Sequence, residues 1–299
     1  MLRLVPKASS VVMELNIMTN NIGRMFFFVM RIYIFLIFTL AFSVSIFGKP
    51  FIDQELLVKE KPFLVGTATD IKTNALLYKE YHYTLEEGKR YVVVYKNSNN
   101  KLIAEKELLY TKKVLNDTNP KLKQNNYLSG ETIEVDTLRA EFRVLVEYRE
   151  STDDRIERKE FEKPQDLVVD AGFNQLILEE WSTLLKNKTI RFEYLAPSLQ
   201  RTFAFTARKD QCDETDSELV NMSSNKKEAT CFSMAPKSWL MRQIVAPISL
   251  VYDSSSKRLL RFSGLGNVGD ESGDYMKVNI RYEYADDSPL AHLKLQFFL

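Results

Sequence analysis

Apolar and polar side chains alternate along most of the chain after residue 49, and this period of two predicts β-strands. In one such run every second residue from Phe142 to Tyr148 is apolar, with charged residues at most positions between them. The same alternation is found in 90–96, 190–194, 203–205, 248–252, 275–284 and 293–297. Turn-forming sequences such as EEGKR and YDSSSKR separate these runs. We therefore expect a mainly β (β+α) fold, in which about ten strands form a curved antiparallel sheet, as a half-barrel, a barrel or a sandwich.

Two segments depart from this period. From Asp170, a good N-cap residue, apolar residues recur at helical spacing, which predicts one central amphipathic helix over about 170–186. A second, shorter helix is predicted between Pro236 and Pro247, because proline suits the first turn of a helix and also stops a helix from continuing. The highly charged segment 151–165 predicts a solvated loop or a hairpin tip.

The first 48 residues predict export. An uncharged apolar run from Ile32 to Phe47 follows Arg31 and ends in small residues, which is typical of a signal peptide over residues 30–48. An uncleaved inner-membrane anchor is the alternative, because the run approaches the ~20 apolar residues of a spanning helix. Residues 1–29 are atypical for a leader and indicate an over-extended start or an unusual leader. Residues 49–299 are expected to form a single β-rich domain that is periplasmic or secreted.

The balance of charged residues excludes one class of partner. The whole chain has a formal net charge of +1, and removal of residues 1–48, with four basic residues and one acidic residue, leaves 37 basic and 39 acidic residues. Such a balance gives no global field that would recruit nucleic acid, so nucleic acid is not expected as a partner.

Cys212 and Cys231 are the two cysteines of the chain. In an exported protein a single pair of this kind predicts one structural disulfide.

The stretch RLLRFSGLGNVGDESGDY contains Gly264, Gly266 and Gly269 in the pattern G-x-G-x-x-G. In dinucleotide-binding proteins this pattern opens a helix whose N-terminus holds the pyrophosphate. Here the last glycine is followed by a carboxylate-rich turn and then by the alternating run YMKVNIRYEY. Strand, glycine-rich turn and strand predict a hairpin, so we expect no nucleotide, and no other cofactor, in this protein.

Glu80 and His82 are the candidates for catalysis. They lie two residues apart, so on a strand they share one face and could form a general-base pair. A surface strand whose polar face holds these residues and Thr84 is the alternative interpretation. No nucleophile motif such as G-x-S-x-G accompanies the pair, and for this reason we name no catalytic residue.

One acidic turn is the candidate for metal binding. Calcium prefers several oxygen ligands from one short loop, but the spacing here does not match that of an EF-hand. We therefore predict no metal site, and we note this turn as the candidate for one in case a metal ion is bound. Its residues are Asn267, Asp270, Glu271 and Asp274.

Aromatic side chains suggest a binding cavity. Phe, Trp and Tyr make up 12% of the chain, which is more than a thin sandwich needs. A helix laid across a curved sheet could leave an apolar cavity lined by aromatic residues, although packing in the core is the alternative for both tryptophans. The ligand-binding candidates are Phe173, Ile177, Trp181, Phe192, Phe203, Phe205 and Trp239.

Three segments carry a resemblance: LLYKEYH, VVDAGFNQLI and YDSSSKRLLRFSGLGNVGD, at residues 76–82, 168–177 and 252–270. They resemble an uncharacterised family of exported bacterial β-rich proteins, and this resemblance implies no activity. Strands that curve around a helix are also similar in architecture to the periplasmic lipoprotein carriers, whose half-barrel holds acyl chains under a helical lid. This second likeness is at the level of the fold, and folds host many functions.

Three functions are compatible with the sequence. The first is a periplasmic protein that binds an apolar molecule such as a lipid without catalysis. The second is an outer-membrane-associated β-barrel, which the alternating strands and the C-terminal HLKLQFFL suit. The third is a hydrolase-like enzyme built on Glu80 and His82. The membrane itself is a partner at the N-terminus if the signal peptide is not cleaved.

Overall fold

The structure is a computed structural model that describes residues 50–110, 117–140, 142–213, 228–243 and 245–285. The described residues all belong to one compact unit, Gly48–Leu299. The expected leader, the signal peptide or anchor from Ile32 to Phe47, and the C-terminal run 293–297 lie outside the described residues.

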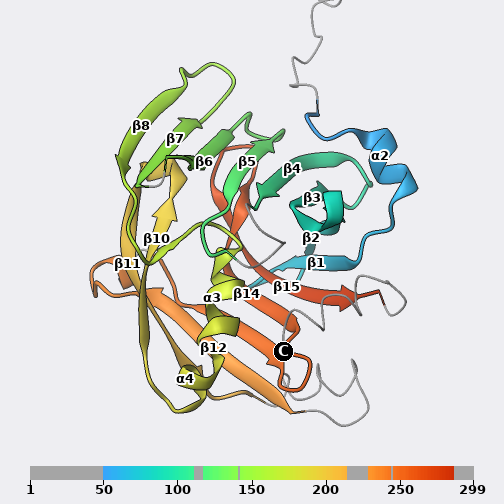
Figure 1. Cartoon of the computed structure of the whole chain (residues 1–299). Helices are drawn as coiled ribbons and strands as arrows, with labels where there is room; N and C mark the ends of the chain where they lie inside the picture. Colours follow the sequence, from blue (N-terminus) through green and yellow to red (C-terminus); the bar gives the residue numbers. More distant parts are fainter. Residues whose placement is uncertain (1–49, 111–116, 141, 214–227, 244, 286–299) are drawn as a thin grey trace, which may run out of the picture. The chain divides into compact units, whose positions relative to one another are not determined.

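The described part of the chain forms one sheet of fifteen strands (Figure 1). The strands are β1 (Leu64–Asp70), β2 (Leu76–Leu85), β3 (Arg90–Lys96), β4 (Leu102–Leu109), β5 (Lys121–Asn126), β6 (Thr132–Ala140), β7 (Arg143–Arg149), β8 (Glu157–Glu162), β9 (Leu167–Val168), β10 (Ile190–Ala196), β11 (Arg201–Asp210), β12 (Ala229–Pro236), β13 (Ile248–Asp253), β14 (Leu259–Gly269) and β15 (Tyr275–Tyr284). Their order in the sheet is β8-β7-β6-β5-β4-β3-β2-β1-β15-β14-β13-β12-β11-β10-β9. The expectation of a mainly β fold with a curved sheet is confirmed, whereas the expected number of about ten strands is wrong.

The sheet consists of two antiparallel meanders. One meander runs from β1 to β8 and the other from β10 to β15, and the first and last strands join them by pairing from Leu64↔Tyr284 to Asp70↔Val278. The short strand β9 pairs with β10 in parallel. Because β8 and β9 are the two edges of the sheet, the sheet is not closed into a barrel within the described residues.

Two of the additional strands, β5 and β8, lack the apolar alternation on which the prediction rested. The inward positions of β5 include Gln124 and Asn126, which are both almost fully buried but polar. Strand β8 lies in the segment that was expected to be a loop or hairpin tip, and its sequence ERKEFE is exposed at most positions. Charged side chains are a common feature of edge strands, because they discourage pairing with another chain.

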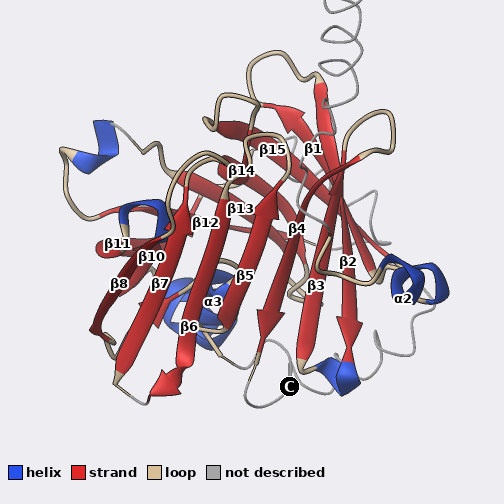
Figure 2. Cartoon of the chain, turned by 90° about the horizontal axis from the view of Figure 1, so that it is seen from above, coloured by secondary structure: helices blue, strands red, loops and turns tan. Residues whose placement is uncertain are grey.

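The predicted central helix is present but broken. Helix α3 spans Gly172–Glu179 and α4 spans Trp181–Leu185, and both lie inside the curve of the sheet (Figures 1 and 2). Ile177 and Leu184 are fully buried in the main hydrophobic core. The expected N-cap role of Asp170 is wrong, because Ala171 occupies that position and Asp170 has a positive φ of 47°.

The second predicted helix is replaced by a connection of bends and turns. Pro236 ends strand β12, and only a short 3-10 turn, η3 (Met241–Gln243), follows it. The guanidinium of Arg242 donates hydrogen bonds to the carbonyl oxygens of Pro236 and Lys237, which fixes this connection without a helix.

The outer face of the sheet is covered over β2 and β3. Helix α2 (Gln54–Lys59) and the residues before it pack there, and Ile52 and Leu57 are buried against Val92 and Val94. The buried carboxylate of Glu105 accepts hydrogen bonds from the N–H groups of Phe51 and Ile52, at 2.7 and 3.1 Å. This segment is therefore fastened to β4 by both apolar contact and hydrogen bonds.

Cys212 and Cys231 form a disulfide that joins the end of β11 to β12 across 19 positions of sequence. Most of the polar segment between them lies outside the described residues. Among the described residues, no helix has the length and the apolar character needed to cross a membrane.

Gly172, at the start of α3, provides a test of this fold. A Cβ atom at this position would lie 1.9 Å from the carbonyl oxygen of Thr118, which also accepts a hydrogen bond from Val169 N–H. We expect Gly172→Ala to lower the free energy of unfolding by at least about 1–3 kcal/mol, because backbone must move to admit the methyl group. Urea unfolding measures this change.

The matched control is Ser182→Ala on the exposed side of α4, which should change stability by less than about 0.5 kcal/mol. An unchanged urea midpoint for Gly172→Ala would contradict the close approach of α3 to residue 118.

Candidate functional site

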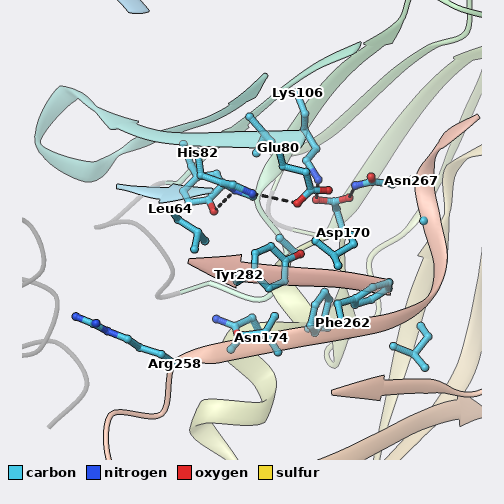
Figure 3. Close-up of a pocket in the computed structure, with 18 of the residues that line it drawn as sticks. Leu64, Glu80, His82, Lys106, Asp170, Asn174, Arg258, Phe262, Asn267 and Tyr282 are labelled. Atoms are coloured by element: carbon cyan, nitrogen blue, oxygen red, sulfur yellow. Dashed lines mark hydrogen bonds and ion pairs between the residues drawn. The ribbon is translucent and has the colours of Figure 1, made fainter. Parts of the chain in front are cut away.

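A cavity of about 220 Å³ lies between the start of α3 and the inner face of the curved sheet (Figure 3). Strands from both meanders supply its wall, together with the turn between β13 and β14. Most lining side chains are aliphatic or aromatic, including Val93, Phe173, Phe262, Leu265 and Ile280. The cavity is thus formed by the curvature of the sheet and by the helix lying across it.

Glu80 and His82 both line this cavity. Tyr78, Glu80 and His82 occupy successive inward positions of β2. Their common face is therefore buried, and the alternative interpretation of a solvent-exposed polar face is wrong. His82 Nε2 lies 3.1 Å from Glu80 Oε2, and His82 Nδ1 lies 2.7 Å from the hydroxyl of Tyr91 on β3. Both ring nitrogens of the histidine are therefore hydrogen-bonded to buried side chains.

Tyrosines surround this pair. The ring of Tyr282 lies 6.0 Å from that of His82, and burial together with the nearby Glu80 raises the pKa of Tyr282 well above its usual value. Gly66 on β1 makes room for the group, because a Cβ there would lie 2.9 Å from both Glu80 Oε2 and the Tyr282 ring. The phenols consequently remain protonated and act as hydrogen-bond donors or packing surfaces rather than as bases.

A second buried polar cluster lies at one end of the cavity. The ammonium of Lys106 on β4 is 2.8 Å from Asp170 Oδ2, and Asn267 on β14 donates a 3.1 Å hydrogen bond to Asp170 Oδ1. Burial alone would raise the pKa of Asp170, but the charge of Lys106 and the hydrogen bonds from Lys106, Asn267 and Ala171 N–H lower it. Asp170 is therefore held as a carboxylate next to its cation.

Side chains of β5 connect this cluster to the opposite part of the sheet. Gln124 Nε2 donates a 2.6 Å hydrogen bond to the carbonyl oxygen of Asn267, and Asn126 Nδ2 donates one of 3.0 Å to that of Gly269. The carbonyl group of Asn267 is accessible because the pairing of β14 with β15 shifts register between Leu265 and Gly269, which leaves Asn267 without a partner residue in the ladder. Sequence analysis missed Lys106, Gln124 and Asn126; their spacing of two or four residues from Leu108 on β4 and from Leu122 on β5 is the signal that could have placed them inside.

The seven ligand-binding candidates are distributed over different environments. Phe173 lines the cavity. None of the other six candidates is among the described residues that form the cavity wall. Trp181 packs in the core against Phe232 and Tyr252, with ring centroids 5.0 and 5.5 Å away. Ile177, Phe192, Phe203 and Phe205 are buried or half-buried in the same core.

Trp239 is 73% exposed in the connection before η3, so it belongs neither to the core nor to the cavity. The predicted helix that would have turned it inward is absent, and this explains its position.

The candidate metal turn does not converge on one point. Asn267 faces inward toward Asp170, whereas Asp270 accepts hydrogen bonds from the N–H groups of Ser272 and Asp274 and so stabilises the hairpin turn. Glu271 is exposed. In the part of the chain that the structure describes, no group of three or more His, Cys, Asp or Glu residues could hold a metal ion.

The glycine pattern belongs to the predicted hairpin of β14 and β15, which is confirmed. Gly269 allows close packing at its end, since a Cβ there would lie 3.0 Å from the carbonyl oxygen of Gly273. The pattern thus serves strand packing near the cavity, without a helix that could hold phosphate.

The ion pair of Lys106 and Asp170 gives a quantitative test. Asp170→Asn should lower the free energy of unfolding by about 3 kcal/mol at neutral pH, because it leaves a buried ammonium without its counter-charge. The double variant Lys106→Met, Asp170→Asn should be more stable than Asp170→Asn alone. Glu160→Gln breaks the exposed pair with Arg143 and should lower the free energy of unfolding by less than about 1 kcal/mol, as the control.

The same variant predicts a pH dependence. A carboxyl whose pKa is lowered by folding stabilises the fold above the unfolded value of about 3.9, and this contribution is lost as the pH falls through the folded value. The difference in stability between the wild type and Asp170→Asn should therefore shrink between about pH 5 and pH 2. A constant difference over this range would show that Asp170 is not an ionised partner of Lys106.

Comparisons with known proteins identify no family for this chain. No family model matches the chain, and no curated protein matches it. Among solved structures it is similar to a crystal structure described as a beta-barrel-like protein of the domain of unknown function DUF1849 from Brucella abortus. The two chains share 7% sequence identity with a TM-score of 0.41, over 76% of this chain and 99% of that chain.

Proposed function

We propose that the domain binds the apolar part of a small molecule, such as a lipid chain, in the cavity under α3, without catalysis. The observation that carries this proposal is a 220 Å³ cavity in the interior of the sheet whose wall is mainly aliphatic and aromatic. An apolar cavity of about 150 Å³ is enough to bind benzene, so this one has room for a larger apolar group. Each buried methylene contributes about 0.8 kcal/mol to such binding.

The polar groups in the wall are compatible with this role. Glu80, His82 and Tyr91 bond to one another, and Lys106 bonds to Asp170, so the ligand does not have to satisfy them. An apolar ligand can therefore enter without leaving a buried charge unpaired, which would cost several kcal/mol.

We also infer that the domain works outside the cytoplasm. The disulfide between Cys212 and Cys231 supports this location, because such bonds persist in oxidising compartments. The expected alternative of an outer-membrane barrel is less favoured, since a spanning barrel needs a closed sheet and the described sheet has two edges.

Filling the cavity tests the proposal. Leu265→Trp replaces an aliphatic side chain at a half-buried position of the wall with a bulkier indole ring. The ring should occupy part of the cavity and weaken binding of the neutral fluorescent probe N-phenyl-1-naphthylamine at least tenfold. Leu199→Trp is the matched control, because Leu199 is 55% exposed and does not line the cavity. Equal affinity of both variants for the probe, or a wild type that does not bind it, would contradict binding in this cavity.

A hydrolase is the second candidate function. The 3.1 Å contact of Glu80 with His82 in the cavity wall favours it, because a carboxylate can orient an imidazole that acts as a base. However, Nε2 of His82 lies against Glu80 and Nδ1 lies against the buried hydroxyl of Tyr91, so a water molecule or another nucleophile would have to displace Tyr91 to reach the imidazole.

We therefore expect equal and negligible hydrolysis of p-nitrophenyl butyrate by the wild type and by His82→Gln. Turnover by the wild type that is lost in His82→Gln, while the variant still binds the naphthylamine probe, would establish the enzyme instead.

A further inference from the structure

The turn between β13 and β14 brings two consecutive cations to the cavity. Lys257 and Arg258 both line it, and they are partly exposed, as are Ser256 and Asn174 nearby. The groups at the other end of the cavity, such as Lys106, are buried. The cavity thus opens to solvent beside this turn, and Figure 3 shows Arg258 at the opposite end from Lys106 and Asn267.

These two cations differ from the buried one in their partners. Lys106 is paired with Asp170, but within the described residues neither Lys257 nor Arg258 has a carboxylate within 4.0 Å. Their contacts are instead with aromatic rings: the Arg258 guanidinium lies 4.9 Å from the ring centroid of Tyr284, and the Lys257 ammonium lies 5.7 Å from that of Trp181. A ring holds a cation in place without neutralising its charge.

The charge of the lining groups is therefore distributed unevenly. At the inner end, Asp170 cancels Lys106 and Glu80 faces His82. At the opening, two positive charges remain. An amphiphile enters such a site with its apolar chain inside and an anionic group at the opening, where guanidinium can bind a carboxylate or phosphate with two parallel hydrogen bonds.

We propose that the ligand of this cavity is a single-chain amphiphile with an anionic headgroup, which Arg258 and Lys257 bind at the opening. This proposal rests on the proposed function, because it assigns the headgroup for a chain that the cavity holds.

The volume limits the length of the buried chain. If about 150 Å³ holds the six carbon atoms of benzene, the 220 Å³ of this cavity hold about nine carbon atoms in proportion. A saturated fatty acid should therefore gain about fourfold in affinity with each added methylene until roughly nine or ten carbons, and should gain little beyond that length.

The test compares ligands that share a chain. Binding of decanoate, decanol and decyltrimethylammonium to the wild-type domain is measured by displacement of N-phenyl-1-naphthylamine at low and high salt. We expect decanoate to bind at least tenfold more tightly than decanol at low salt, the preference to fall at high salt, and the cation to bind most weakly.

The variant Arg258→Gln removes the charge and keeps much of the side chain. It should lower the affinity for decanoate about tenfold and leave that for decanol unchanged. Arg281→Gln is the matched control, because Arg281 is exposed on β15 and does not line the cavity. Circular dichroism and thermal unfolding establish that the variants are folded, and the comparison of the three ligands on the wild type needs no variant.

The outcomes separate the two proposals. If decanoate and decanol bind equally, or if the decyltrimethylammonium ion binds best, the anionic headgroup is wrong and apolar binding stands. If Arg258→Gln weakens decanoate and decanol by the same factor, Arg258 is not the headgroup ligand and this inference is overturned. If none of the three ligands displaces the probe and the probe itself does not bind, the proposed function fails.

Discussion

The buried ion pair of Lys106 and Asp170 is the interaction on which the architecture of the cavity depends. With Asn267 it joins β4, the segment that leads into α3, and β14, which are far apart in sequence. Burying two charges costs several kcal/mol per ion, and only close pairing with further hydrogen bonds offsets that cost. The pair is consequently satisfied in one arrangement of these three segments, and this arrangement sets α3 across the inner face of the sheet.

Polar contacts across the interior allow the sheet to curl so tightly. Gln124 and Asn126 on β5 reach carbonyl groups of β14, although five strands separate β5 from β14 in the sheet. The shift of register between Leu265 and Gly269 leaves Asn267 outside the ladder with β15, so this irregularity of β14 and two amide side chains act together. An entirely apolar interior would lack these directional contacts and would specify the curvature less strictly.

The period of two along the chain was sufficient to predict a curved antiparallel sheet, and the helical spacing after Asp170 was sufficient to predict a helix inside it. The period of two failed where the buried residues of a strand are polar, or where a strand has no buried face. Strand β5 buries amides, and β8 is a charged edge, so neither shows an apolar face. The spacing of Glu80 and His82 was sufficient to identify the pair. The burial of the pair could not be predicted, because the pairing of β1 with β15 helps to enclose it, and these strands come from distant parts of the chain. The cations at the opening had no pattern in sequence to mark them.

The pairing of β1 with β15 also has a consequence for how the domain folds. Leu64 is opposite Tyr284, so the first strand finds its second neighbour only when almost the whole chain is present. Contacts of such sequence separation slow folding, since the loop between them must close before the contact forms. Until then β1 offers an unpaired edge to other chains. Newly made chains in which β1 has not yet paired with β15 are therefore exposed to edge-to-edge aggregation, and this hazard grows with the concentration of unfolded chains.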